Sequence, residues 1–208
     1  MPTEVQDYIV VHELCHRKEM NHSPKFWAEV RKVLPDYEKQ KIWLKEHGDG
    51  IMMRMTGRNS MIRIMFVCHG NICRSPMAEF IFKDMLKKCG REKEFTVVSS
   101  ATSTEEIWND IGNPVYPPAQ EELAKHGISC KGKRAVQLKK SDYDKFDLFL
   151  CMDSRNVTNA MRIFGGDPNN KVRKLLKNKD VSDPWYTDRF DVAYNDIYDG
   201  CRQLLENL

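Results

Sequence analysis

From residue 61 onwards the sequence alternates between short apolar runs and amphipathic stretches, and this alternation constrains the fold most. Ile62, Ile64 and Phe66 precede Cys68 in a run that predicts a strand, and residues 76–88 predict an amphipathic helix. Strands that alternate with helices form a parallel sheet covered on both faces. We therefore expect an α/β fold, a doubly wound four-stranded parallel sheet that binds ligands at the carboxyl ends of its strands. The further predicted elements are strands at 95–99 and 146–151 and helices at 119–126, 156–164 and 190–205.

The N-terminal part of the chain lacks this alternation and predicts helices only. Val5, Tyr8, Ile9 and Leu14 recur at helical spacing. Ser23 is followed by proline, a pair that is typical of the cap and first turn of a helix. We therefore expect a short all-helical segment before the sheet domain.

The two parts are separated by a stretch with the composition of a linker. Residues 48–60 contain three glycines and show no periodicity. A new methionine, Met61, stands directly before the first predicted strand. We therefore expect a gene fusion in which a helical segment, residues 1–47, is joined through this linker to a domain at residues 61–208.

The composition is that of an ordinary globular protein, with 41% hydrophobic and 30% charged residues. A formal net charge of +3 is too small to indicate nucleic acid or a membrane surface as the main partner. The basic cluster of Lys131, Lys133 and Arg134 predicts a solvated loop. Seven cysteines, an odd number without regular spacing, favour reduced thiols in a cytoplasmic protein over a disulfide framework.

Cys68 and Arg74 enclose five residues between the predicted strand and helix. Such a loop can turn successive backbone N–H groups inward around an anion, and the helix adds the positive end of its dipole. The guanidinium of Arg74 matches two phosphate oxygens, and the same field favours the thiolate form of Cys68. A thiolate can attack phosphorus and form a phosphocysteine. Gly70 is expected to adopt torsions that a side chain blocks.

The segment VCHGNICRSPMAE resembles the active-site signature of the low-molecular-weight protein tyrosine phosphatase family, and the likeness runs from about Arg63 to the C-terminus. A second segment, DPWY at 183–186, resembles a late segment of that family in which the aspartate is the general acid. The resemblance implies hydrolysis of phosphotyrosine without metal or organic cofactor. Cys68 is then the nucleophile, Arg74 the phosphate clamp and Asp183 the general acid and later the base.

The resemblance also implies roles for neighbouring residues. Asn71, Ser75, Ser99 and His126 resemble the family's hydrogen-bond network that holds the phosphate loop, with Ser99 and His126 as supports from outside the loop. Asp153 is expected to cap a helix and not to act in catalysis. The residues expected to contact substrate are His69, Gly70, Asn71, Ile72, Cys73, Ser75 and Trp185.

The same resemblance leaves some alternatives open. Protein arginine phosphatases have threonine where this chain has Ile72, and an apolar residue there suits an aromatic ring. Trp185 and Trp108 are candidates for the walls of the substrate slot. Arsenate reductases need further redox cysteines, which form no obvious relay here. A module that only binds phosphopeptides has no need for the acid Asp183. Cys73 is interpreted equally as a reversible disulfide partner of Cys68 and as a small core residue.

The N-terminal segment carries a second motif, H-E-x-x-H, formed by His12, Glu13 and His16. Residues four apart share one helix face, so both histidines can bind one Zn²⁺, with Glu13 as base and His22 as third ligand. This segment resembles the C-terminal helical part of the YgjP-like zinc metallopeptidase family over residues 5–46. A zinc-dependent hydrolase is therefore the competing function. The absence of that family's sheet and cleft from this sequence argues against peptidase activity.

Overall fold

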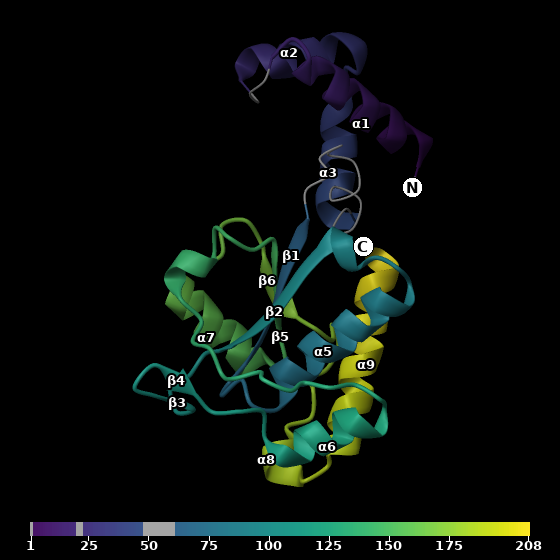
Figure 1. The fold of residues 1–208 in the computed structure, drawn as a ribbon. Helices are drawn as coiled ribbons and strands as arrows, with labels where there is room; N and C mark the ends of the chain where they lie inside the picture. The colour runs from purple at the N-terminus through teal and green to yellow at the C-terminus, as the bar shows by residue number, and fades with distance from the viewer. Residues whose placement is uncertain (1, 20–22, 48–60) are drawn as a thin grey trace. The chain divides into compact units, whose positions relative to one another are not determined.

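The computed structural model describes residues 2–19, 23–47 and 61–208 (Figure 1). The chain divides into two compact units, Met1–Arg58 and Asn59–Glu206, and each is described by itself. The expected linker at residues 48–60 lies outside the described residues. Among the helices that are described, none is long and apolar enough to cross a membrane.

The first unit contains the helices α1 (Thr3–His16), α2 (Pro24–Val33) and α3 (Tyr37–His47). The cap expected at Ser23 is present, because its Oγ accepts a hydrogen bond of 3.3 Å from the backbone N–H of Phe26. Phe26 is fully buried in the core of this unit. Leu14 lies in α1 as expected, but it is 54% exposed, and the neighbouring Cys15 packs into the core.

The second unit is built on a four-stranded parallel sheet, as expected. Its strands are β1 (Ile62–Cys68), β2 (Phe95–Ala101), β5 (Leu148–Cys151) and β6 (Val172–Lys174), in the order β2-β1-β5-β6. From β1 the chain first adds β2 on one side of this strand and then adds β5 and β6 on its other side. In open α/β sheets such a switch point opens a crevice at the carboxyl ends of the strands, where Cys68 ends β1.

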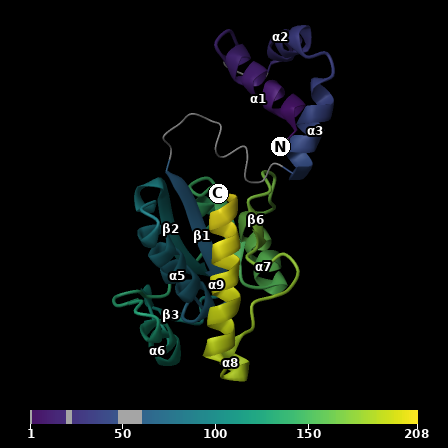
Figure 2. The same cartoon turned by 90° about the vertical axis from the view of Figure 1, so that its right-hand side faces the viewer.

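Helices cover both faces of this sheet (Figure 1). α7 (Ser154–Phe164) lies on one face, and α5 (Arg74–Lys88) and α9 (Phe190–Asn207) lie on the other. Figure 2 views the domain from the α9 side, with the sheet behind that helix. The short elements are α6 (Pro117–Lys125), α8 (Pro184–Thr187), the 3₁₀ turns Glu92–Glu94 and Lys140–Asp142, and the hairpin strands β3 (Ile107–Trp108) and β4 (Ile111–Gly112).

Strand β1 lies at the centre of the core, and its last five residues are all buried. On this strand Phe66 is fully buried and meets Phe82 of α5 edge-on, with ring centroids 5.9 Å apart. On the α7 side, Phe149 packs against Phe164 at 4.7 Å. This packing fixes the end of β1 and the start of α5, and therefore the loop between them.

Two features of the second unit were not expected from the sequence. Strand β6 has three residues, of which only Val172 is buried, so it lacks a readable apolar period. The β3–β4 hairpin turns at Asn109 and Asp110, both in the left-handed conformation with φ of 49° and 63°. Asparagine and aspartate are the residues that tolerate this conformation, so the Asn-Asp pair was the available signal.

Candidate active site

The sulfur of Cys68 lies at the centre of the loop that follows β1. The thiol is 3% exposed, its Sγ accepts a hydrogen bond of 3.2 Å from the backbone N–H of Asn71, and it lies 3.0 Å from Ser75 Oγ. Asn71 has φ of 58°, a left-handed conformation that turns its amide toward the sulfur. These donors stabilise negative charge on the sulfur.

The structure shows a different reason for the glycine at position 70 from the unusual torsions that were expected. Within this loop Asn71 has a left-handed conformation, whereas Gly70 does not. A Cβ on Gly70 would lie 3.0 Å from Cγ of Glu106, which leaves little room for a side chain. The glycine therefore makes space for the neighbouring loop.

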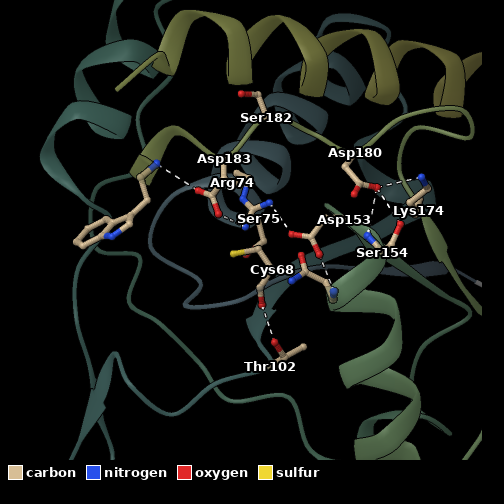
Figure 3. A network of polar contacts seen from close by, with 12 residues as sticks. Cys68, Arg74, Ser75, Thr102, Asp153, Ser154, Lys174, Asp180, Ser182 and Asp183 are labelled. Atoms are coloured by element: carbon tan, nitrogen blue, oxygen red, sulfur yellow. Dashed lines mark hydrogen bonds and ion pairs between the residues drawn. The ribbon is translucent and has the colours of Figure 1, made fainter. Parts of the chain in front are cut away.

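Arg74 is the first residue of α5 and is 4% exposed. Its Nη1 donates to Asp153 Oδ2 at 2.7 Å, and its Nη2 donates to Asp183 Oδ2 at 2.5 Å (Figure 3). Burial alone would lower the pKa of Arg74. The negative charges of Cys68, Asp183 and Asp153 outweigh burial and raise that pKa above its ordinary value. The guanidinium therefore remains a cation inside the site.

Asp183 reaches this site from a distant part of the sequence. It is the N-cap of α8, where its Oδ1 accepts a hydrogen bond of 3.2 Å from the backbone N–H of Trp185. Its other oxygen, Oδ2, contacts Arg74. The structure thus brings together three residues that the sequence singled out for chemistry, Cys68, Arg74 and Asp183.

Asp153 has a second contact that the sequence did not reveal. It caps α7 as expected, because its Oδ1 accepts a hydrogen bond of 2.6 Å from the backbone N–H of Asn156. Its Oδ2 also forms the ion pair with Arg74. A capping aspartate is a local signal, whereas this second partner is 79 residues away.

Asn71 also connects the loop to the structure behind it. Its Nδ2 donates to Ser75 Oγ and to Ser99 Oγ, both at 2.8 Å. Its Oδ1 accepts a hydrogen bond of 3.0 Å from the backbone N–H of Val136. Ser99 therefore contacts the loop through Asn71.

The network continues into a buried ion pair. Ser99 Oγ donates to Glu79 Oε2 at 2.6 Å, and Lys133 Nζ lies 3.1 Å from the same oxygen. The side chains of Glu79 and Lys133 are 5% and 11% exposed. The prediction that the basic cluster at 131–134 is a solvated loop is therefore wrong for Lys133, whose charge is drawn inward by the buried carboxylate.

His126, expected to support the loop, lies elsewhere. Its ring stacks on Tyr194 of α9, with centroids 3.7 Å apart and an interplanar angle of 7°. Its Nε2 lies 3.5 Å from Glu122 Oε1 one helical turn earlier. The position at the end of α6 directs this ring toward α9, and Lys133 is the basic residue that reaches Ser99 instead.

The sulfur opens into a cavity of about 730 Å³. The expected substrate contacts that line it are His69, Gly70, Ile72, Cys73 and Trp185, whereas Asn71 and Ser75 are not part of its lining. Trp108 does not line it either: this tryptophan is 70% exposed on the β3–β4 hairpin. Tyr186, which was not among the expected substrate contacts, lines the cavity beside Trp185.

Cys73 differs in character from Cys68. Burial, followed by the charges of Cys68 and Asp183, raises the pKa of Cys73 to about 12. Cys73 is therefore held as a neutral thiol at neutral pH. All seven cysteines are free in the structure.

In the first unit, His12 and His16 converge as expected. Their Nε2 atoms lie 3.2 Å apart, and Tyr8 Oη lies 3.4 Å from His12 Nδ1. Glu13 is exposed, and His22 lies outside the described residues. A zinc site uses at least three protein ligands, and no group of three or more His, Cys, Asp or Glu side chains forms one among the residues the structure covers. The described residues thus supply an incomplete donor set for zinc.

Sequence comparisons agree with this division of the chain. The model of the family described as low molecular weight phosphotyrosine protein phosphatase matches residues 63–208, and that of the YgjP-like metallopeptidase domain matches residues 1–47. The low molecular weight protein-tyrosine-phosphatase YfkJ of Bacillus subtilis is 38% identical over 154 residues, which is 71% of this chain and 96% of that protein. A low molecular weight phosphotyrosine protein phosphatase of Schizosaccharomyces pombe is 35% identical over 71% of this chain and 97% of its own length.

Solved structures give the same result. The crystal structure of Bacillus subtilis YfkJ matches with a TM-score of 0.67 over 72% of this chain and 96% of that chain, at 38% identity. That of a low molecular weight protein tyrosine phosphatase from Streptococcus pyogenes matches with 0.64 over 71% and 93%, at 34% identity. Vibrio vulnificus Wzb in complex with benzylphosphonate matches with 0.61 over 72% and 100%, at 25% identity. The chain belongs to the low molecular weight phosphotyrosine protein phosphatase family.

Proposed function

We propose that the protein is a protein tyrosine phosphatase that hydrolyses phosphotyrosine through a phosphocysteine intermediate. The observation that carries this proposal is the convergence of Cys68, Arg74 and Asp183 on one cavity. Two relatives, 38% and 35% identical, are named as a protein-tyrosine-phosphatase and a phosphotyrosine protein phosphatase, and they support it. Cys68 is the nucleophile, Arg74 binds the phosphoryl oxygens and Asp183 transfers the proton.

In the first step the sulfur of Cys68 attacks phosphorus while the bond to the phenolic oxygen breaks. Charge that develops on the equatorial oxygens is stabilised by the guanidinium of Arg74 and by the backbone N–H groups of the loop. Asp183 gives its proton to the departing phenolic oxygen. The product is a tyrosine side chain and a phosphorylated Cys68.

In the second step the carboxylate of Asp183 takes a proton from water, and the water oxygen attacks phosphorus. The bond between phosphorus and sulfur breaks, which returns the sulfur of Cys68 to its anionic form and releases inorganic phosphate. The hydrogen bonds from Asn71 and Ser75 favour this leaving sulfur. The two steps use groups of this chain and one water molecule, and they need no metal or organic cofactor.

The lining of the cavity supports an aromatic substrate. Ile72 supplies an apolar surface to the lining, and Trp185, which is 57% exposed, supplies an aromatic ring. The related Wzb binds benzylphosphonate, which likewise joins an aromatic ring to a phosphorus-centred anion.

The seven free thiols support a reducing cytoplasmic location.

The test compares hydrolysis of phosphotyrosine, phosphoserine and phosphoarginine peptides, with and without a metal chelator. We expect release of phosphate from the phosphotyrosine peptide at an unchanged rate when chelator is present. Rapid acid quenching during turnover should trap one phosphoryl group on the peptide that contains Cys68, detected by mass spectrometry. Preference for phosphoarginine, or loss of activity with chelator, would contradict the proposal.

A further inference from the structure

The cavity carries more negative charge than the binding of a phosphate requires. Two guanidinium groups line it, those of Arg74 and Arg155, together with five carboxylates. A site that only attracts a dianion is expected to have the opposite balance. The five carboxylates are those of Glu105, Glu106, Asp153, Asp180 and Asp183.

Three of these carboxylates contact a lysine or arginine of the domain. Asp153 and Asp183 share Arg74, and Asp180 Oδ1 lies 3.0 Å from Lys174 Nζ. The remaining pair, Glu105 and Glu106, lies on the loop between β2 and β3 and has no lysine or arginine partner among the described residues.

Glu106 lies directly against the phosphate loop. Its Cγ is the atom that a Cβ on Gly70 would meet at 3.0 Å. Asn113 Nδ2 donates to its Oε2 at 2.7 Å, and the backbone N–H of Asn113 donates to its carbonyl oxygen at 2.8 Å. No lysine or arginine among the described residues forms an ion pair with Glu106. Its carboxylate is thus held by Asn113, and the residue forms part of the cavity lining.

Glu105 extends this charge to the rim. Its side chain is 71% exposed, and its Oε2 lies 2.9 Å from Nε2 of His69 in the phosphate loop. The backbone N–H of Ser103 also donates to the carbonyl oxygen of His69 at 2.9 Å. The acidic loop is therefore held in register with the loop that binds phosphate.

We propose that Glu106, assisted by Glu105, selects phosphotyrosine polypeptides that carry lysine or arginine beside the phosphotyrosine. This inference rests on the proposed phosphatase function. A cavity of about 730 Å³ is within the range of roughly 300–1,000 Å³ that holds drug-sized ligands, so it has room for a neighbouring side chain. A substrate cation placed there is attracted by the carboxylates of the acidic loop, which offset part of the hydration that it loses.

The test uses two phosphotyrosine peptides that are identical except for lysine or glutamate on both sides of the phosphotyrosine. We expect the wild-type protein to give the higher kcat/KM with the lysine peptide. Glu106→Gln keeps an oxygen for the hydrogen bond from Asn113 and removes only the charge. It should lower the ratio of the two kcat/KM values by about two- to fivefold, the range of a partly exposed ion pair.

Two control variants make the result specific. Glu121→Gln removes an exposed carboxylate of α6 that does not line the cavity, and it should leave the ratio unchanged. Arg155→Gln removes a cation from the lining and should increase the preference for lysine. The wild-type preference should also weaken as ionic strength rises from about 0.01 M to about 1 M, because the Debye length falls from about 30 to 3 Å.

Equal kcat/KM values for the two wild-type peptides, or a ratio that Glu106→Gln does not change, would overturn the inference. Hydrolysis of p-nitrophenyl phosphate by the same preparations separates this failure from that of the proposed function. A protein that cleaves the aryl phosphate but does not discriminate between the peptides loses only the inference. A protein that cleaves none of the three substrates loses both.

Discussion

At Arg74 a buried guanidinium is held by two carboxylates that come from different helix starts. Asp153 precedes α7 and Asp183 precedes α8, and each uses one oxygen for a helix N–H and the other for the guanidinium. The orientation of the clamp is thus coupled to two capping interactions. Bidentate recognition of phosphate depends on this orientation, so the caps belong to the site as much as to the helices.

The role of Asp183 as the acid can be tested by its dependence on the leaving group. Asp183→Asn retains an oxygen for the Trp185 N–H but cannot supply a proton. We expect kcat to fall by about 10²- to 10⁴-fold for phenols of high pKa, and by much less for nitrophenols, which leave without protonation. A series of aryl phosphates measures this slope. Equal slowing across the series would exclude the acid role.

The role of Cys68 is tested by removing its sulfur. Cys68→Ser should lower kcat for p-nitrophenyl phosphate by at least about 10³-fold, because the hydroxyl is a far weaker nucleophile than a thiolate. Near-ultraviolet circular dichroism should show an intact fold. Cys89→Ser, at an exposed cysteine, is the matched control and should retain activity. Normal turnover by Cys68→Ser would remove this residue from the mechanism.

The two cysteines of the phosphate loop should differ in reactivity. The pKa of Cys73 is raised from 9.0 to about 12, so below that pH this residue is almost entirely the unreactive thiol. Cys68, which has an amide N–H directed at its sulfur, should be alkylated first by iodoacetamide at neutral pH. Peptide mapping by mass spectrometry measures the order. Prior modification of Cys73 would contradict it.

At the scale of elements, the phosphate loop is held in place by β2 and by the segment before the second 3₁₀ turn. The buried pair of Glu79 and Lys133 supports Ser99, and Ser99 supports Asn71. Removing one partner of a buried ion pair leaves the other charge less well compensated. The phosphate loop therefore depends on a residue 59 positions beyond Arg74, since 133 − 74 = 59.

This dependence can be measured with Lys133→Met, which retains much of the apolar side chain. We expect a loss of about 1–3 kcal/mol in the free energy of unfolding, because Glu79 stays buried with one charged partner fewer. Urea denaturation provides the measurement. Lys131→Met, at an exposed position of the same loop, is the control and should change stability little. Equal effects of the two substitutions would contradict the structural role of Lys133.

The elements that surround the site were predictable where the signal is local. β1, the loop and α5 are contiguous, so Cys68 and Arg74 could be placed from apolar pattern and spacing. Asp183 followed from a resemblance, because nothing in its neighbourhood points to a partner 109 residues away. Glu79 and Lys133 were missed because each resembles a surface charge until the fold buries them together. His126 was misplaced because a helix end does not reveal what its side chain contacts.

At the scale of the whole molecule, the α/β class and the helical N-terminal segment were both predictable, because 2.0- and 3.6-residue periods do not resemble each other. The short β6 and the hairpin were not, because two or three residues carry no period. The motif in α1 was also only partly informative. Its spacing brings His12 and His16 together, whereas a metal site needs donors from other elements, which a helical motif does not specify.

The division into two units predicts the result of a large truncation. A chain that begins at residue 61 keeps every described residue that lines the cavity. We expect its kcat/KM for p-nitrophenyl phosphate to lie within about twofold of the full chain, a difference of only about 0.4 kcal/mol. Size-exclusion chromatography should give a single folded species. An insoluble or inactive product would contradict independent folding of the second unit.

The carboxylates on Arg74 also bear on how the product leaves. A phosphate that enters the cavity meets a cation already engaged by Asp153 and Asp183, so binding is an exchange of partners. When inorganic phosphate departs, the same two groups can reclaim the guanidinium at once. We therefore expect the two carboxylates to compete with inorganic phosphate for the guanidinium and so to favour its release.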